Sequence, residues 1–174
     1  IDEIQAKKLE GVSLEVGDVL LNITGDSVAR VCQVPDYALP ARVNQHVALI
    51  RPDPNTFDAK FLRYFLASER QQNSMLALAS AGATRNALTK GMIESFLIPA
   101  PELEVQHSIA RVLGGLDDRI TLLRETNKTL EAIAQAIFKS WFVDFDPVKA
   151  KMDGRQPAGM DEETAALFPD ELVE

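Results

Sequence analysis

The side chains that could perform acid–base, nucleophilic or metal chemistry are few in this sequence. Asp144 and Asp146 form one short acidic pair without convergent partners, and a helix-terminating turn is the favoured interpretation. His46 has no identifiable partner carboxylate, so we expect a packed or surface side chain, and Cys32, inside an apolar run, is expected to be a small buried hydrophobe. No Asn/Asp-Pro-Pro-aromatic motif, Gly-rich phosphate loop or metal-ligand cluster occurs. The sequence therefore predicts no catalytic residue, no metal and no cofactor.

Polar loop residues are better suited to contacts with nucleic acid. The candidates are Thr84, Arg85, Asn86 and Lys90, in and after a loop that Gly82 introduces, followed by Arg30, Arg42 and Asn44. Arg85 and Asn86 combine a side chain that pairs with guanine edges and one that pairs with adenine edges. The second group suits phosphate or base contacts. An ordinary solvated loop is the equal alternative for any one of these residues.

A long apolar seam dominates the third quarter of the chain. Its members alternate at spacings of four and three residues: Ile109, Leu113, Leu116, Ile120, Leu123, Asn127, Leu130, Ala134, Ile137 and Trp141. A repeat of 3.5 residues winds one helix against another, so the segment needs a second helix. At 1.5 Å per residue it forms a rod of roughly 50 Å. Asn127, at an a position, suits the fixing of register and partner number.

The apolar stripe widens at the far end of this rod. Phe138 and Phe142 lie beside the seam and, with Ile137 and Trp141, make the stripe wider than a two-helix contact can cover. Large exposed apolar patches usually mark binding surfaces. We expect a partner to dock there, and the alternative is that this end folds back on the chain's own globular domain.

Strands and helices are expected to mix in one domain before the rod. The predicted strands are 19–23, 29–33 and 43–51, and the predicted helices run from an N-cap at Asp58 to near Gly82, over 88–95, and from Pro101 through the seam to a stop within 144–147. Pro101 suits the first helical position, with Glu102 and Glu104 in the first turn. Gly114 and Gly115 are the weak point of the long helix, where a kink is possible.

Composition restricts the class of protein. The net charge of -8 divides unevenly, with 10 Lys/Arg against 11 Asp/Glu in residues 1–100 and 8 against 15 in residues 101–174. This balance alone leans against a free-standing DNA-binding domain. No apolar run reaches the length of a membrane span and no secretory signal opens the chain, while a single cysteine fits a reducing cytoplasm. The first residue is Ile1, which suggests a fragment or a processed chain.

Several segments, in this order, resemble the specificity subunit of Type I restriction-modification systems. The matching segments are 97–101, 104–120, 141–148 and 154–170, with weaker landmarks at 43–46 and 82–85. The chain departs from the family where Val105–Gln106 replaces the usual Glu-Gln. It also carries only about 100 residues before the long helix, fewer than the family's target-recognition domain usually has.

The resemblance implies an α+β fold and three regions. These are part of a target-recognition domain over 1–100, the long helix of a conserved coiled-coil region over 101–145 and an acidic linker or tail over 146–174. It implies a non-catalytic, cytoplasmic subunit that recognises double-stranded DNA and holds a methylation subunit and, through it, a restriction subunit. The long helix would pair with a second copy or with the second half of a complete subunit. The predicted interface is Leu113, Leu116, Ile120, Leu123, Asn127, Leu130, Ile137, Phe138, Trp141 and Phe142. A coiled-coil adaptor without DNA binding is the alternative.

Overall fold

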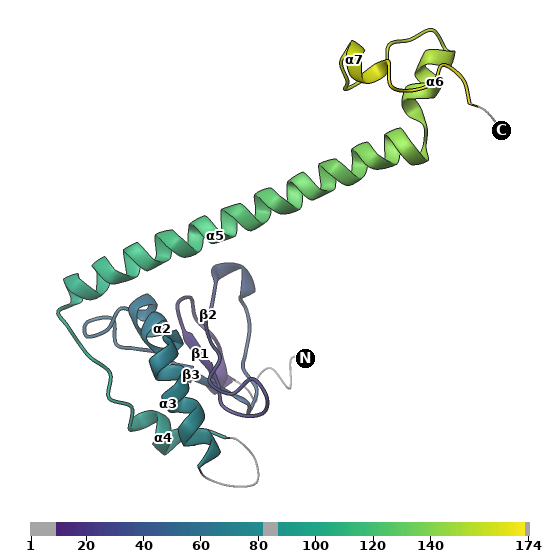
Figure 1. Ribbon diagram of the computed structural model, residues 1–174. Coiled ribbons are helices and arrows are strands. Elements are labelled where there is room, and N and C mark those ends of the chain that lie inside the picture. The colour runs from purple at the N-terminus through teal and green to yellow at the C-terminus, as the bar shows by residue number, and fades with distance from the viewer. Residues whose placement is uncertain (1–9, 82–86, 173–174) are drawn as a thin grey trace. The chain divides into compact units, whose positions relative to one another are not determined.

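The computed structural model describes residues 10–81 and 87–172 and confirms the predicted α+β fold (Figure 1). Its elements are η1 (Glu10–Val12), β1 (Val19–Asn22), β2 (Val31–Gln33), η2 (Asp36–Ala38), β3 (Val47–Ile50), α2 (Ala59–Ala67), α3 (Glu69–Ser80), α4 (Lys90–Glu94), α5 (Leu103–Phe138), the π-helical η3 (Lys139–Val143), α6 (Asp146–Met152) and α7 (Glu162–Ala165). By internal contacts the chain forms two compact units, residues 1–116 and 117–174. The predicted boundaries at residues 100 and 145 stay predictions.

A three-stranded antiparallel sheet, in the order β2-β1-β3, organises the first unit. Alternate side chains of a strand point to opposite faces. In β1, Val19 and Leu21 are fully buried, whereas Leu20 and Asn22 are only partly buried. The buried face needs a cover, and α2 and α3 supply it.

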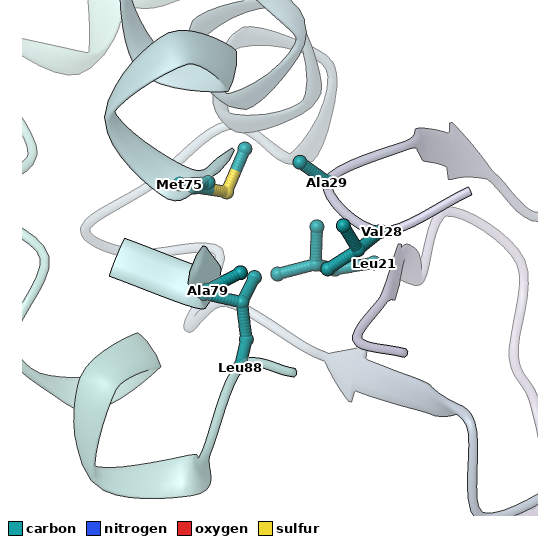
Figure 2. Close-up of a cluster of buried hydrophobic side chains, with 6 residues drawn as sticks. All are labelled: Leu21, Val28, Ala29, Met75, Ala79 and Leu88. Carbon is teal, nitrogen blue, oxygen red and sulfur yellow. The ribbon is translucent and has the colours of Figure 1, made fainter. Parts of the chain in front are cut away.

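Two apolar clusters join the sheet to these helices. The larger cluster consists of Leu21, Val28, Ala29, Met75, Ala79 and Leu88 (Figure 2). Leu21 comes from β1 and Met75 from α3, while Leu88 lies two residues before α4. In the second cluster, Val19 packs with Leu62 and Leu66 of α2. The end of the β1–β2 loop and the segment before α4 are thus held in the core.

Local capping places the two covering helices. The Asp58 carboxylate accepts a hydrogen bond from the Phe61 N–H at 2.7 Å, which confirms the predicted N-cap of α2. Ser68 has an extended backbone that ends α2, and its hydroxyl accepts from the Gln71 N–H at the start of α3. The helical pattern that begins at Asp58 is therefore interrupted once, at Ser68.

The strands are shorter than predicted because turns replace their first residues. The predicted strand over 43–51 begins only at Val47, since the Asn44 side chain accepts from the His46 N–H at 3.0 Å and the Asn44 carbonyl accepts from the Val47 N–H. Such an Asx turn competes with strand pairing. The predicted strand over 29–33 begins at Val31, because Ala29 adopts a left-handed backbone with φ 68°.

The start of α5 is fastened to the first unit by Gln106, which is 1% exposed. Its amide oxygen accepts from the Asp58 N–H at 3.0 Å, and its amide nitrogen donates to the Thr56 and Pro101 carbonyls at 3.1 and 2.8 Å. Pro101 therefore lies before the helix rather than at its first position, which Leu103 takes. Beyond this joint, α5 continues without a break through Gly114 and Gly115.

A charged network closes the far end of the sheet. The buried Asp18 carboxylate accepts two hydrogen bonds from Arg51, at 2.7 and 2.8 Å, and Arg51 also pairs with Glu15 at 2.6 Å. The hydrogen bond from Arg51 lowers the pKa of Asp18 below its ordinary value, against the opposing effect of burial. The Asp18 carboxylate beside β1 therefore neutralises the positive charge of Arg51.

The second unit has more order than the linker or tail expected after residue 145. The π-helical turn η3 follows α5, and Phe145 takes a left-handed backbone with φ 55° before α6 begins. Val148, Ala150 and Ala165 are buried, so α6 and α7 share a small apolar core. The predicted helix-terminating turn is present: Asp144 pairs with Lys139, and Asp146 accepts from the Ser140 hydroxyl at 2.7 Å.

Replacing Gln106 with alanine should destabilise the first unit by about 2–4 kcal/mol, because one N–H and two carbonyls lose their partners inside the protein. Urea unfolding measures the change. The matched control is Gln135→Ala, at an exposed position of the same helix, which should change the free energy of unfolding by less than about 0.5 kcal/mol. Equal stability of the two variants would contradict the role given to Gln106.

Candidate nucleic-acid interface and partner-binding helix

Three loops meet at the end of β1, and Ile23 is the residue that joins them. Its N–H donates to the His46 carbonyl, and its carbonyl accepts from the Leu88 N–H, both at 2.9 Å. On the other side of the strand, the Asn22 N–H donates to the Arg30 carbonyl at 2.9 Å. The β1–β2 loop, the turn before β3 and the segment before α4 are therefore held side by side by backbone hydrogen bonds.

This arrangement brings several of the predicted nucleic-acid residues to one end of the sheet. Arg30 leads into β2, Asn44 opens the turn before β3, and Lys90 begins α4 two residues after Leu88. Arg30 and Asn44 are exposed, and the Lys90 side chain is 88% exposed. Thr84, Arg85 and Asn86 lie outside the described residues. Ala87, which follows them, forms a β-bridge with Thr24.

Arg42 is placed differently from the other candidates. It forms a β-bridge with Ser13, and its Nε is buried with no hydrogen-bond partner in the described part of the chain. The prediction of a buried Cys32 is wrong, because its side chain is exposed. Its side chain lies on the opposite face of β2 from the residues that contact the helices, a consequence of strand alternation that the apolar run alone did not reveal.

The charge at this end of the sheet differs from that of the whole chain. Segments 22–30, 44–46 and 87–90, which meet at this end, contain Arg30 and Lys90 against the single acid Asp26. Lys90 pairs with Glu94 at 3.5 Å on the surface of α4, an exposed contact of small energy. Within the described ranges Arg30 has no ion pair, whereas Arg51 at the opposite end is neutralised by Asp18 and Glu15. A basic end thus exists in a chain of net charge -8.

The seam of α5 is exposed along most of its length. Every residue from Asp118 to the end of the helix at Phe138 is exposed. Leu116, Leu123 and Leu130, which lie at every second seam position, keep 58%, 52% and 56% of their surface in contact with solvent. Burying these side chains would favour association by about 25 cal/mol per Å² of apolar surface.

An apolar groove follows the end of the seam. Phe168, from the segment after α7, packs on Trp141 and Phe142 with ring centroids 5.6 and 6.0 Å apart. The groove has a volume of about 750 Å³ and is also lined by Phe145, Leu167 and Leu172. Phe138 and Phe142 remain 60% and 53% exposed at its edge. Sequence reasoning missed Phe168, because nothing local marks an aromatic residue 27 positions from Trp141 as its neighbour.

The described segments provide no sign of a metal centre or a membrane span. Among residues 10–81 and 87–172, no group of three or more His, Cys, Asp or Glu side chains is placed to hold a metal ion. No helix within those ranges combines the length and apolarity needed to cross a bilayer.

Two known proteins with similar sequences are both named as specificity subunits of Type I restriction enzymes. The family model described as the Type I restriction modification DNA specificity domain matches residues 7–132. The chain is 35% identical over 164 residues to the Type I restriction enzyme HindI specificity subunit of Haemophilus influenzae, a match covering 94% of this chain and 35% of the relative. It is 37% identical over 86 residues to the MjaIX specificity subunit of Methanocaldococcus jannaschii, covering 49% of this chain and 20% of the relative. The chain thus spans about a third of the length of the first of these curated relatives.

Solved structures share the fold. The HsdS subunit from Thermoanaerobacter tengcongensis aligns with a TM-score of 0.53 at 21% identity, over 86% of this chain and 36% of that chain. A structure of a type I R-M system, described in terms of its complex assembly and conformational transition, aligns with a TM-score of 0.51 at 22% identity and the same coverage.

Proposed function

Because this chain belongs to the family of Type I restriction-modification DNA specificity domains, we propose that it is a DNA-recognition and scaffold element of such a complex. It performs no catalysis itself and works in the cytoplasm. The observation that carries the proposal is the basic end of the sheet, where the segments that contain Arg30, Asn44 and Lys90 are held together by backbone hydrogen bonds; Arg85 and Asn86 precede the last of these segments in the sequence. Protein cations placed together against a duplex gain affinity by releasing counterions from its phosphates.

The chemistry of these side chains suits some of them to base edges and others to phosphates. Arg85 and Asn86 read base edges, since arginine pairs with guanine and asparagine with adenine in the major groove. Arg30, Arg42 and Lys90 contact phosphates, and Asn44 and Thr84 add uncharged contacts. The acidic second unit stays away from the duplex and serves protein partners instead.

The scaffold part of the proposal assigns the exposed seam of α5 to a second helix of the same kind. In an antiparallel pair, a positions of one helix face d positions of the other. A single register pairs all ten seam residues in this way: Leu113 with Ile137, Leu116 with Ala134, Ile120 with Leu130, Leu123 with Asn127 and Ile109 with Trp141. The second helix belongs to another copy of this chain or to the other half of a complete subunit.

The aromatic groove beyond the seam docks the methylation subunit, through which the restriction subunit joins. Phe138 and Phe142 expose more apolar surface than a helix pair covers, and the groove adjoining them is lined mainly by apolar side chains.

DNA recognition is tested in the assembled complex by comparing two kinds of variant. Arg85→Ala or Asn86→Ala should reduce discrimination at one base pair by about 1–3 kcal/mol, because one base-edge contact is lost. Arg30→Gln should weaken binding to all duplexes and lower the slope of log affinity against log salt by about 1. Arg155→Gln, an exposed arginine of the second unit, is the control and should change neither. Unchanged affinity for every duplex in all three loop variants would favour the adaptor without DNA binding.

Pairing of α5 is tested by disulfide cross-linking in a Cys32→Ser background, which removes the exposed native thiol. The double variant Leu116→Cys/Ala134→Cys should oxidise to a covalent dimer, because the two positions face each other only between antiparallel chains. Within one helix they lie roughly 27 Å apart, too far for a disulfide. Each single variant should stay uncross-linked. A covalent dimer of Leu116→Cys alone would indicate parallel pairing, and a monomeric double variant would exclude the register.

Docking at the aromatic groove is tested with Phe138→Gln/Phe142→Gln. Loss of two exposed rings should abolish capture of the methylation subunit while the melting temperature of the first unit stays unchanged. Leu122→Gln, which removes an equally exposed side chain outside the seam, is the matched control and should bind normally. Retained capture by the double variant would assign the methylation subunit to another surface.

A further inference from the structure

A second polar element lies at the DNA-facing end of the sheet, in the turn before β3. The His46 ring is exposed, yet both of its nitrogens have partners: Nδ1 lies 2.8 Å from the Thr24 hydroxyl oxygen and Nε2 lies 3.2 Å from the Gln45 amide nitrogen. The His46 N–H also donates to the Asn44 side chain. An exposed imidazole held at both ring nitrogens, on a backbone fixed by a third hydrogen bond, has a defined orientation.

The hydrogen-bond partners of His46 determine which polar groups of Thr24, Gln45 and His46 remain free. An amide nitrogen only donates, so His46 Nε2 accepts from Gln45, and Nδ1 carries the proton and donates to the Thr24 oxygen. This tautomer is assigned from the hydrogen-bond network. The Thr24 hydroxyl proton and the second Gln45 amide proton are not used in these two contacts and are left as donors. A surface with two free donors beside Arg30 and Lys90 matches an acceptor-rich anion.

From this geometry we infer that Thr24, Gln45 and His46 form a neutral phosphate-contacting element of the DNA surface, with His46 as the positioning residue between two donors. Uncharged side-chain donors such as threonine and glutamine commonly bind DNA phosphates. The element lies where the loops meet, because Ile23, next to Thr24, bonds to both His46 and Leu88. Thr24 itself bridges to Ala87, two residues after Arg85 in the sequence. The inference rests on the proposed function and assigns it residues that the loop sequence alone did not indicate.

The element should contribute to affinity without contributing to sequence preference or to salt dependence. In the assembled complex, Gln45→Ala and His46→Ala should each weaken binding to a short random-sequence duplex by about tenfold, the loss expected for a hydrogen bond to a charged group. The salt slope should stay unchanged, since no cation is removed. Gln45→Glu should weaken binding further and Gln45→Lys should strengthen it, for all duplexes alike.

Positioning by His46 is separated from simple contact by a double-mutant cycle. Thr24→Val keeps the volume but removes the hydroxyl, and its effect should not add to that of His46→Ala, because both break the same hydrogen bond. Melting temperatures should stay within a degree or two of the parent protein, as the Asn44–His46 turn is exposed.

Three outcomes overturn the inference. Unchanged duplex affinity in Gln45→Ala and His46→Ala, with Arg30→Gln still weakening binding, removes the element and leaves the proposed function intact. A loss confined to duplexes with one particular base pair would make Gln45 a base reader instead. Unchanged affinity in all of these variants, Arg30→Gln included, would refute DNA binding by this surface altogether.

Discussion

An amphipathic helix whose apolar seam stays in solvent cannot be at its lowest free energy alone, and α5 imposes this constraint on the rest of the molecule. Its side chains are exposed from Asp118 to Phe138, although leucine or isoleucine occupies every seam position in that range except Asn127 and Ala134. A partner helix must supply the missing burial, and the 3.5-residue repeat restricts that partner to a helix of matching period.

The joint at Gln106 transmits this constraint to the sheet. A buried amide with three satisfied hydrogen bonds holds the first turn of α5 against the residues that cap α2. The segments 56–58 and 99–102 are thereby both held to the first turn of α5. A rigid junction of this kind is what a scaffold needs when the spacing between recognition surfaces has to be fixed, because a flexible linker spreads that spacing over many values.

Charge is distributed unevenly in the molecule. Arg51 is neutralised by Asp18 and Glu15 at one end of the sheet, while at the other end Arg30 has no ion pair within the described ranges and Lys90 pairs with the exposed Glu94. Most of the acid lies in residues 101–174. Because charges more than about a Debye length apart are screened, a locally basic surface can exist on a chain of net negative charge.

The sequence by itself determined what depends on neighbours within about four residues. The heptad register and the Asp58 cap follow from side chains that act on their own turn of helix, and the absence of a catalytic motif needed no coordinates. The break at Ser68 was found only in the structure. The structure alone decided the contacts between distant residues: Ile23 with His46 and Leu88, Gln106 with Thr56, and Phe168 with Trp141. It also corrected Cys32, since the facing of a strand residue depends on which side the helices cover, and it shortened two strands at the Asn44 turn and at the left-handed Ala29. Local propensity carries no information about partners brought together by folding, and for this reason the tertiary structure, not the sequence, revealed the polar element around His46.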